Sequence, residues 1–425
     1  MSVTRQSLLS RRQILTIVGT GSTVALAGCS ENGSNGEGES SPEDSDQSSS
    51  ETQTEQEQDQ TASTENGEIN LTQQWKFSTD SRGVASPSVH DGVAYTGDLD
   101  GVIHAVDTTS GEEQWSKNVG SLSRAPVVFD TVVYAPSNNG VYALDAETGE
   151  QQWVFEGIAG REEAQRPLVG DDKLYVGIGT LDANSEGRVY GLRRSNGEQV
   201  WQYDGLRQTG GGASRVVSGK ESVIFTSFTG KVLTAVNQSD GSQQWSVDGL
   251  GETVSVDAAP AVGQNAVFFI HEGANAEYGP GVVRAIDPTN GSTTWTFDLG
   301  KRSQAPPTVA NGTVYVGTDD GWLYALNAAD GEKRWEYQIQ TGGNIRAKPT
   351  VSNGRIYVGI EKYTPTGNTA GAVHAFNTAG DKIGKIDLPS VIGRPPEGIR
   401  AQPIVRDERI YIGTLDGSLF ALSIN

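Results

Sequence analysis

Residues 306–335 read PPTVANGTVYVGTDDGWLYALNAADGEKRW, and this stretch decides the fold. It contains four short segments in which apolar and polar residues alternate. Asn311-Gly312 and Asp320-Gly321 separate the first three segments, and a longer turn around Gly331 precedes the fourth. Asn-Gly and Asp-Gly turns supply the positive φ that tight hairpins need. The stretch therefore predicts four antiparallel strands joined by hairpins.

The same unit returns along the chain from residue 71 to residue 425, in copies of 38 to 51 residues. Counting the third strand of each copy predicts eight units, and four-stranded units at this period are typical of propeller blades. The last copy has three strands, whereas the segment ending at Trp75 is a fourth strand with no copy before it. We therefore predict an all-β, eight-bladed propeller in which the N-terminal strand completes the C-terminal blade and removes two exposed edges.

Tryptophan recurs in the fourth strand of seven copies, at a nearly fixed offset from a turn glycine. A constant offset predicts the same environment for every indole, which we expect to be wedged between its own blade and the next. The series is Trp75, Trp115, Trp153, Trp201, Trp245, Trp295 and Trp335. The seventh blade lacks this tryptophan, so we expect its joint with the eighth blade to be the softest.

These units resemble the PQQ-type (quinoprotein) β-propeller repeat, A-x-D-x-x-T-G-x-x-x-W, over residues 71–425. One branch of that family comprises quinone-dependent dehydrogenases, and another comprises non-enzymatic lipoproteins such as the BamB-like propellers. The dehydrogenases carry adjacent cysteines, a bound calcium ion and a catalytic Asp. This chain has one cysteine, Cys29, and no insertion that would supply the calcium ligands. The resemblance therefore implies the BamB-like type, with no enzymatic activity and no cofactor; a PQQ-dependent dehydrogenase is the alternative.

The N-terminus predicts export and lipid attachment. Arg11 and Arg12 precede a short apolar run that resembles a twin-arginine signal, and residues 26–29, LAGC, resemble a lipobox in which Cys29 carries the lipid. Residues 30–70 are rich in acidic and small polar residues, which predicts a disordered tether. The predicted organisation is a signal peptide (1–29), an acidic tether (30–70) and a propeller (71–425).

The chain carries 53 acidic and 32 basic residues, a formal net charge of -21. Such a charge disfavours nucleic acid as a partner. An acidic surface that stays hydrated in concentrated salt suggests a halophilic source, with ordinary acidic solubility as the alternative.

Basic residues recur just before or at the start of the inner strands, in seven of the eight blades. They are Arg82, Arg124, Arg166, Arg215, Arg302, Arg346 with Lys348, and Arg400. The fifth blade has Asp257 instead. These cations either form a positive collar around the channel that binds an anionic ligand or partner, or pair with acids of neighbouring blades. Insertions at 177–188, 271–281 and 361–372 are expected on the same face, which favours binding there.

The sequence predicts no catalytic residue and no metal site. His104 and His374 stand where other blades carry tyrosine in the third strand, so we interpret them as tyrosine replacements. The acidic turns DLDG and TDDG match the hairpin turns of the other blades and are too short to enclose calcium.

The leading hypothesis is an exported, lipid-anchored, monomeric propeller at the extracytoplasmic membrane face, which binds an unidentified protein or anionic ligand. The alternatives are a PQQ-dependent dehydrogenase and a BamB-like outer-membrane assembly factor. We expect that replacing Arg346, Lys348 and Arg400 together removes partner binding while stability is retained.

Overall fold

The computed structural model describes residues 67–120, 125–158, 162–180, 186–218, 220–229, 233–247, 259–272, 279–339, 343–362, 369–389 and 398–425. The predicted signal, tether and lipidation site, with Arg11, Arg12 and Cys29, lie outside these residues, as do Arg124 and Asp257. For Arg215 only the backbone is described.

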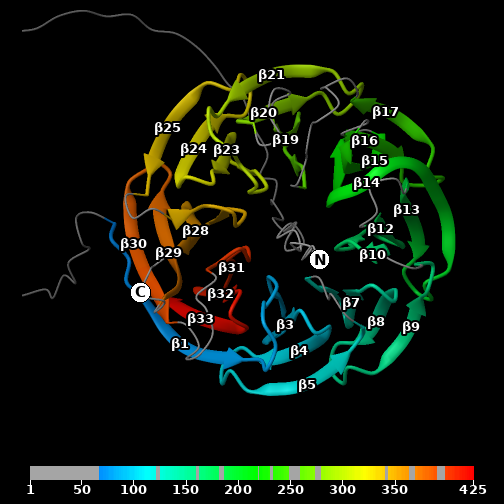
Figure 1. Cartoon of the computed structure of the whole chain (residues 1–425), viewed down its shortest axis with the longest axis horizontal. Helices are drawn as coiled ribbons and strands as arrows, with labels where there is room; N and C mark the ends of the chain where they lie inside the picture. Colours follow the sequence, from blue (N-terminus) through cyan, green and yellow to red (C-terminus); the bar gives the residue numbers. More distant parts are fainter. Residues whose placement is uncertain are drawn as a thin grey trace, which may run out of the picture. The chain divides into compact units, whose positions relative to one another are not determined.

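Eight antiparallel blades form a ring, and the chain passes from blade to blade in sequence order (Figure 1). This confirms the predicted eight-bladed propeller. Blade 1 contains β2 (Ser88–His90), β3 (Val93–Gly97), β4 (Val102–Asp107) and β5 (Glu113–Asn118). Blade 2 contains β6 (Val127–Phe129), β7 (Val132–Pro136), β8 (Val141–Asp145) and β9 (Gln151–Phe155). Blade 3 contains β11 (Leu168–Val169), β12 (Lys173–Thr180), β13 (Glu186–Arg193) and the first part of β14 (Gln199–Ser218).

Blade 4 contains the rest of β14, β15 (Lys220–Thr229), β16 (Leu233–Asn237) and β17 (Gln243–Val247). Blade 5 contains β18 (Ala261–Val262), β19 (Val267–Glu272), β20 (Gly281–Ile286) and β21 (Thr293–Asp298). Blade 6 contains β22 (Thr308–Ala310), β23 (Thr313–Gly317), β24 (Trp322–Asn327) and β25 (Lys333–Gln338). Blade 7 contains β27 (Thr350–Ser352), β28 (Arg355–Lys362), β29 (Thr369–Asn377) and β30 (Lys382–Pro389). Blade 8 contains β31 (Ile404–Arg406), β32 (Arg409–Gly413), β33 (Ser418–Ile424) and β1 (Leu71–Ser78).

The ring closes through β1, which pairs antiparallel with β33 from Leu71 opposite Ile424 to Ser78 opposite Ser418. Trp75 lies opposite Ala421 in this register. The N-terminal strand is therefore the fourth strand of the C-terminal blade, as the incomplete last copy predicts, and it covers the edge that β33 would otherwise expose.

Proline determines where each inner strand begins. In seven blades a proline stands directly before the first residue of the inner strand. These are Pro87, Pro126, Pro167, Pro260, Pro307, Pro349 and Pro403. Proline has no N–H to donate, so it interrupts strand pairing. Blade 4 has no such proline, and β14 continues through its 20 residues from the outer edge of blade 3 to the inner edge of blade 4.

The hydrophobic core lies between adjacent blades. Ile270 and Val283 of blade 5, for example, pack in one cluster with Val314 and Val316 of blade 6. The outermost strands alternate between exposed and half-buried residues, as in β25. Each blade is therefore stabilised mainly by apolar surface that it buries against its two neighbours.

The loops at one end of the blades are longer than the loops at the other end. We call the end with the longer loops the loop-rich face; it contains the links into the inner strands and the turns between second and third strands. The backbone fixes this arrangement, because Leu99 N donates to Arg82 O at 3.2 Å and Asp319 N donates to Arg302 O at 2.9 Å. The opposite end, the hairpin face, contains the short turns between first and second strands, such as the one at Asn311, which has a φ of 49°.

Candidate binding face and channel cations

Each of the seven indoles connects its blade to the next. The Nε1 donates to a backbone carbonyl in the third-to-fourth-strand turn of the following blade, at 2.9 to 3.1 Å. The pairs are Trp75 with Thr108, Trp115 with Ala146, Trp153 with Arg194, Trp201 with Gln238, Trp245 with Pro288, Trp295 with Ala328 and Trp335 with Thr378. A turn glycine lies under each ring; a Cβ on Gly149, for example, would come within 2.7 Å of Trp115. These tryptophans form the joints of the ring.

The joint between blades 7 and 8 is built differently. Gly384 lies opposite Ala375, the register position that Trp335 holds opposite Ala325. Blade 8 has no turn between β33 and β1 for an indole to contact. Ile69 fills the place instead: its N–H donates to Ile383 O at 2.8 Å, and it packs in a cluster with Leu71 and Ile383.

Three of the predicted collar cations form an ion-pair network across blades 6, 7 and 8. Arg346 donates to Asp319 Oδ2 at 3.1 Å and to Glu361 Oε2 at 2.9 Å. Arg400 donates through Nε and Nη2 to Glu361 Oε1, at 3.1 and 2.8 Å. Arg302 Nη1 lies 3.9 Å from Asp319 Oδ2. Burial disfavours the charged form of Arg346, yet the two carboxylates outweigh it and raise its pKa.

Arg346 and Arg400 each pair with an acid of the preceding blade, as the second interpretation of the collar expected, whereas Arg302 lies near an acid of its own blade. Sequence reasoning missed both acids. Asp319 belongs to an acidic turn interpreted only as a hairpin, and Glu361 begins an insertion whose register was unknown. Every side chain in the network retains some exposure, between 13% and 25%.

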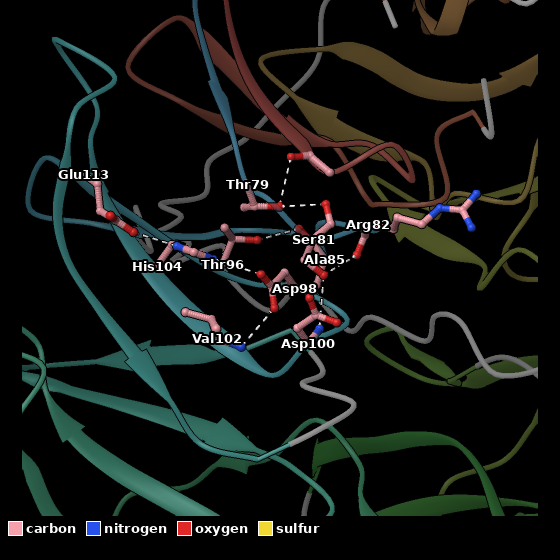
Figure 2. Close-up of polar contacts among 11 residues, drawn as sticks. Thr79, Ser81, Arg82, Ala85, Thr96, Asp98, Asp100, Val102, His104 and Glu113 are labelled. Carbon is pink, nitrogen blue, oxygen red and sulfur yellow. Dashed lines mark hydrogen bonds and ion pairs between the residues drawn. The ribbon is translucent and has the colours of Figure 1, made fainter. Parts of the chain in front are cut away.

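The other collar residues lie apart from this network. Arg82 is exposed, and Figure 2 shows its guanidinium directed away from the Asp98–His104 pair. Arg215 lies within β14 and pairs with Val223, so it does not precede its inner strand. Arg166 and Lys348 each stand directly before an inner-strand proline. Burial lowers the pKa of Arg166 to about 10, and burial followed by the charge of Arg166 lowers the pKa of Lys348 to about 8.

A second polar cluster surrounds His104 on β4 (Figure 2). Nδ1 lies 2.7 Å from Glu113 Oε1, and Nε2 lies 3.2 Å from Asp98 Oδ2. His104 and Asp98 are 8% and 3% exposed. Burial disfavours the imidazolium, but the hydrogen bonds to Asp98 and Glu113 outweigh it and raise the pKa of His104. The residue thus occupies the tyrosine position as predicted, but it makes ionic contacts that a tyrosine could not.

The Asp98 carboxylate in the acidic turn of blade 1 already forms hydrogen bonds within its own blade. Asp98 Oδ1 accepts from Val102 N at 2.9 Å, while Oδ2 faces His104. Across the described residues, no group of three or more His, Cys, Asp or Glu is placed to hold a metal ion. The ranges of the chain that the structure describes also contain no helix long and apolar enough to cross a membrane.

The insertions reinforce the loop-rich face. In blades 3 and 7 the second strands, β12 and β28, have eight residues, against five in β3, β7, β23 and β32. Short link strands pair with the added length: β10 (Glu162–Ala164) pairs with β12, and β26 (Gly343–Asn344) pairs with β28. The residues that lengthen β12 and β28 are thus tied by backbone hydrogen bonds to the links that lead into their own blades.

The fold and the repeated joints define a β-propeller of PQQ-type repeats. A family model described as outer membrane protein assembly factor BamB matches residues 67–228 and 279–380, so the chain belongs to that family. Among curated relatives, the BamB of Moranella endobia is 29% identical over 93 residues, 22% of this chain and 24% of that protein. The quinoprotein alcohol dehydrogenase PedH of Pseudomonas putida is 39% identical over 67 residues, 15% of this chain and 11% of that protein. The chain thus spans less than a quarter of the length of these relatives.

Solved structures show the same fold over most of the chain. The crystal structure of BamB from Moraxella catarrhalis has a TM-score of 0.62 at 22% identity and covers 83% of this chain and 97% of its own. Quinohemoprotein alcohol dehydrogenase from Comamonas testosteroni has a TM-score of 0.65 at 15% identity and covers 83% of this chain and 76% of its own.

Proposed function

We propose that the protein is an exported, lipid-anchored, non-catalytic propeller that binds a partner protein with its loop-rich face. The two reinforced hairpins of blades 3 and 7 carry this proposal. The ring closes without such long hairpins elsewhere, because the second strands of blades 1, 2, 6 and 8 have only five residues. Extended hairpins on one end of a scaffold are typical of binding surfaces.

The ion-pair network adds a specificity element to the same face. Arg346, Glu361 and Arg400 are held by one another in fixed orientations, and they retain partial exposure at the base of the blade 7 projection. An acidic group of a partner meets three arginines and two carboxylates here, a local excess of positive charge on an otherwise acidic protein. Charge contrast of this kind orients a partner more than it strengthens binding.

Attachment to the membrane rests on the lipobox and on family membership. The family description names an outer membrane assembly factor, which supports a place at a membrane outside the cytoplasm. Lipid on Cys29 would anchor the protein there. Replacement Cys29→Ser is expected to move the protein from the membrane fraction to the soluble fraction after export, and unchanged fractionation would contradict the anchor.

Site-specific photo-crosslinking tests which face binds. A photoreactive residue replaces Asp100 or Asp320 in exposed turns of the loop-rich face, and Asn311 or Asn353 in exposed turns of the hairpin face serve as matched controls. Crosslinking is carried out in the native cells. We expect the same crosslinked partner from Asp100 and Asp320 and none from the controls; equal crosslinking from both faces would contradict the proposal.

A quinone-dependent dehydrogenase is the second candidate, favoured by the local similarity to PedH. Addition of PQQ, calcium and an artificial electron acceptor to the purified protein with an alcohol discriminates the two. Reduction of the acceptor would support the dehydrogenase, and our proposal expects neither binding of PQQ nor turnover.

A further inference from the structure

The chain contains five Asn-x-Ser/Thr triplets with no proline at the middle position, the pattern in which exported proteins accept N-linked glycans. The triplets begin at Asn32, Asn70, Asn237, Asn290 and Asn311. Asn32 lies outside the described residues, and the other four lie in or beside short turns of the blades. The sequence treats the five as equal, whereas the fold gives each described triplet a different exposure and different contacts.

The four described triplets all lie at the hairpin face. The third-to-fourth-strand turns belong to this face, because Ala328 N donates to Gly312 O at 3.0 Å, between the two turns of blade 6. Blades 4 and 5 carry triplets at such turns, blade 6 carries one in its first-to-second-strand turn, and blade 8 carries one where β1 begins beside the end of β33. The sequence has no such triplet in the links and turns of the loop-rich face. Glycans on these triplets would therefore leave the proposed binding face uncovered.

The triplet at Asn290 forms an exposed Asx turn after β20. Ser292 N donates to Asn290 Oδ1 at 2.8 Å, and Gly291 between them has a φ of 76°, which glycine adopts without strain. Asn290 Nδ2 donates to Asp287 Oδ2 at 3.2 Å, in a contact on the surface. Asn290 and Ser292 are both exposed, and no hydrogen bond joins the Ser292 hydroxyl to any residue that the structure describes. An enzyme can therefore reach both the carboxamide and the hydroxyl that the triplet supplies.

The other three described triplets are less accessible. In blade 6 the hydroxyl residue, Thr313, is 4% exposed and accepts from Arg334 Nη1 at 2.6 Å. In blade 4, Asn237 is half-buried, and its Oδ1 accepts from both the N–H and the hydroxyl of Ser239 at 2.8 Å. In blade 8 the hydroxyl of Thr72 is bonded to β33 at 2.6 Å. Because a twin-arginine signal exports proteins that have already folded, these contacts decide which triplet an enzyme can use.

We propose that Asn290 is N-glycosylated outside the cytoplasm, an inference that rests on the proposed export. The donor is an oligosaccharide whose anomeric carbon is linked to a polyisoprenyl phosphate in the membrane. Asn290 Nδ2 forms a bond to the anomeric carbon while the bond from that carbon to the phosphate oxygen breaks. The lipid phosphate leaves with the electron pair, the carboxamide loses one proton, and no oxidant or reductant takes part.

Mass spectrometry of the protein purified from the membrane fraction of its native cells tests the site. Trypsin releases residues 285–301, which contain the Asn290 triplet, and residues 303–333, which contain the Asn311 triplet and serve as an internal control. We expect the first peptide to carry the mass of an oligosaccharide and the second to carry none. Ser292→Ala should lose the glycan and Ser292→Thr should keep it, because the hydroxyl is required. Both variants should retain the Tm of the unglycosylated parent, since the residue is exposed.

Export is measured in the same cells by digestion with protease added to spheroplasts, so that the two proposals can fail separately. An exported protein with an unmodified peptide 285–301 would overturn the glycan and leave the proposed function standing. A protein that stays in the cytoplasm would overturn both. Equal modification of the two peptides, or a glycan that persists in Ser292→Ala, would also overturn the assignment of Asn290. Replacement of Arg11 and Arg12 by lysine should block export and leave peptide 285–301 unmodified; a glycan on this retained protein would contradict the membrane donor.

Discussion

Ile69 packs against Gly384, the residue that stands in blade 7 at the tryptophan position of the other blades. A Cβ on Gly384 would lie 2.7 Å from Ile69 Cγ1. Ile69 therefore takes over the joint at the one place where the following blade has no turn to receive an indole. The softness of this joint stays a prediction; a single aliphatic side chain here replaces an indole ring and its hydrogen bond.

Truncation of this side chain should weaken the closure of the ring. Ile69→Ala removes buried methyl groups at the closure and is expected to lower the free energy of unfolding by about 2–4 kcal/mol. Ile69→Val should cost about 1 kcal/mol. Urea unfolding monitored by tryptophan fluorescence measures both. Equal stability of the three proteins would show that β1 and β33 close the ring without Ile69.

The glycines under the indoles should be more sensitive than glycines in open turns. Gly149 and Gly354 have φ of 71° and 72°, but only Gly149 lies under a ring; nothing lies within 4 Å of a Cβ on Gly354. Both alanine variants carry a strain of about 1 kcal/mol from the positive φ. Gly149→Ala should cost about 1–3 kcal/mol more, because its methyl group displaces Trp115. Denaturant unfolding of the two variants gives the difference, and equal losses would contradict the joint.

His104 should make stability depend on pH. Its folded pKa is raised above the unfolded value of about 6.5, so its contribution is complete below about pH 6.5 and is lost as pH rises through the folded pKa. His104→Gln retains a polar side chain and removes the titration. The difference in unfolding free energy between parent and variant should shrink from pH 6 to pH 9, measured by urea unfolding in closely spaced buffers. A constant difference would exclude the raised pKa.

Lys348 should have the opposite pH dependence. The pKa of Lys348 is about 8 in the folded protein and about 10.4 in the unfolded chain. Between these two pH values the unfolded chain binds more protons than the folded protein. The parent protein therefore becomes more stable as the pH rises from about 8 to about 10.4. Lys348→Met removes the buried charge and should stabilise the protein by about 1–3 kcal/mol at pH 7, with a gain that fades above pH 10. Thermal and urea unfolding at pH 7 and pH 10 check this; a destabilised variant at pH 7 would contradict it.

The sequence alone led us to expect that Arg346, Lys348 and Arg400 can be replaced together with stability retained; the network around Glu361 now leads us to predict a loss of stability. Removal of both arginines leaves Glu361, 16% exposed, without its partners. We expect Arg346→Met to cost about 1–2 kcal/mol and Glu361→Gln to reduce that cost, because the pair is partly buried. A double-mutant cycle by urea unfolding measures the coupling. A coupling energy near zero would mean that solvent screens the pair completely.

The ring was predictable because each repeat contains the sequence signals for its own strands and turns. Asn311-Gly312 and the tryptophan offset are local signals, and eight weak copies reinforce one another. The three-stranded last copy and the unmatched strand at Trp75 then leave one way to close the sheet. The continuous strand β14 has a fainter sequence signal, which is the missing proline before the inner strand of blade 4.

The site was less predictable because its contacts depend on distance across the ring. The position of Lys348 before Pro349 is visible in the sequence, but its burial depends on how the blades pack around it. Likewise, Glu361 lies in the part of β28 that the insertion in blade 7 adds, where it pairs with Asn344 of β26. Side-chain partners in different blades leave no periodic signal.

Asn70 and Asn425 donate to each other's carbonyls, at 2.8 and 3.0 Å, as two residues flanking a hairpin turn do. A two-residue linker would therefore join them without moving a strand, and the polypeptide could be cut at the corresponding turn of another blade, for example at Gly111. Such circular permutants separate Ile69 from the ring, so they should keep all eight blades but lose the stability that Ile69 contributes. The fold therefore does not depend on where the chain is interrupted, and any blade could come first or last in the sequence.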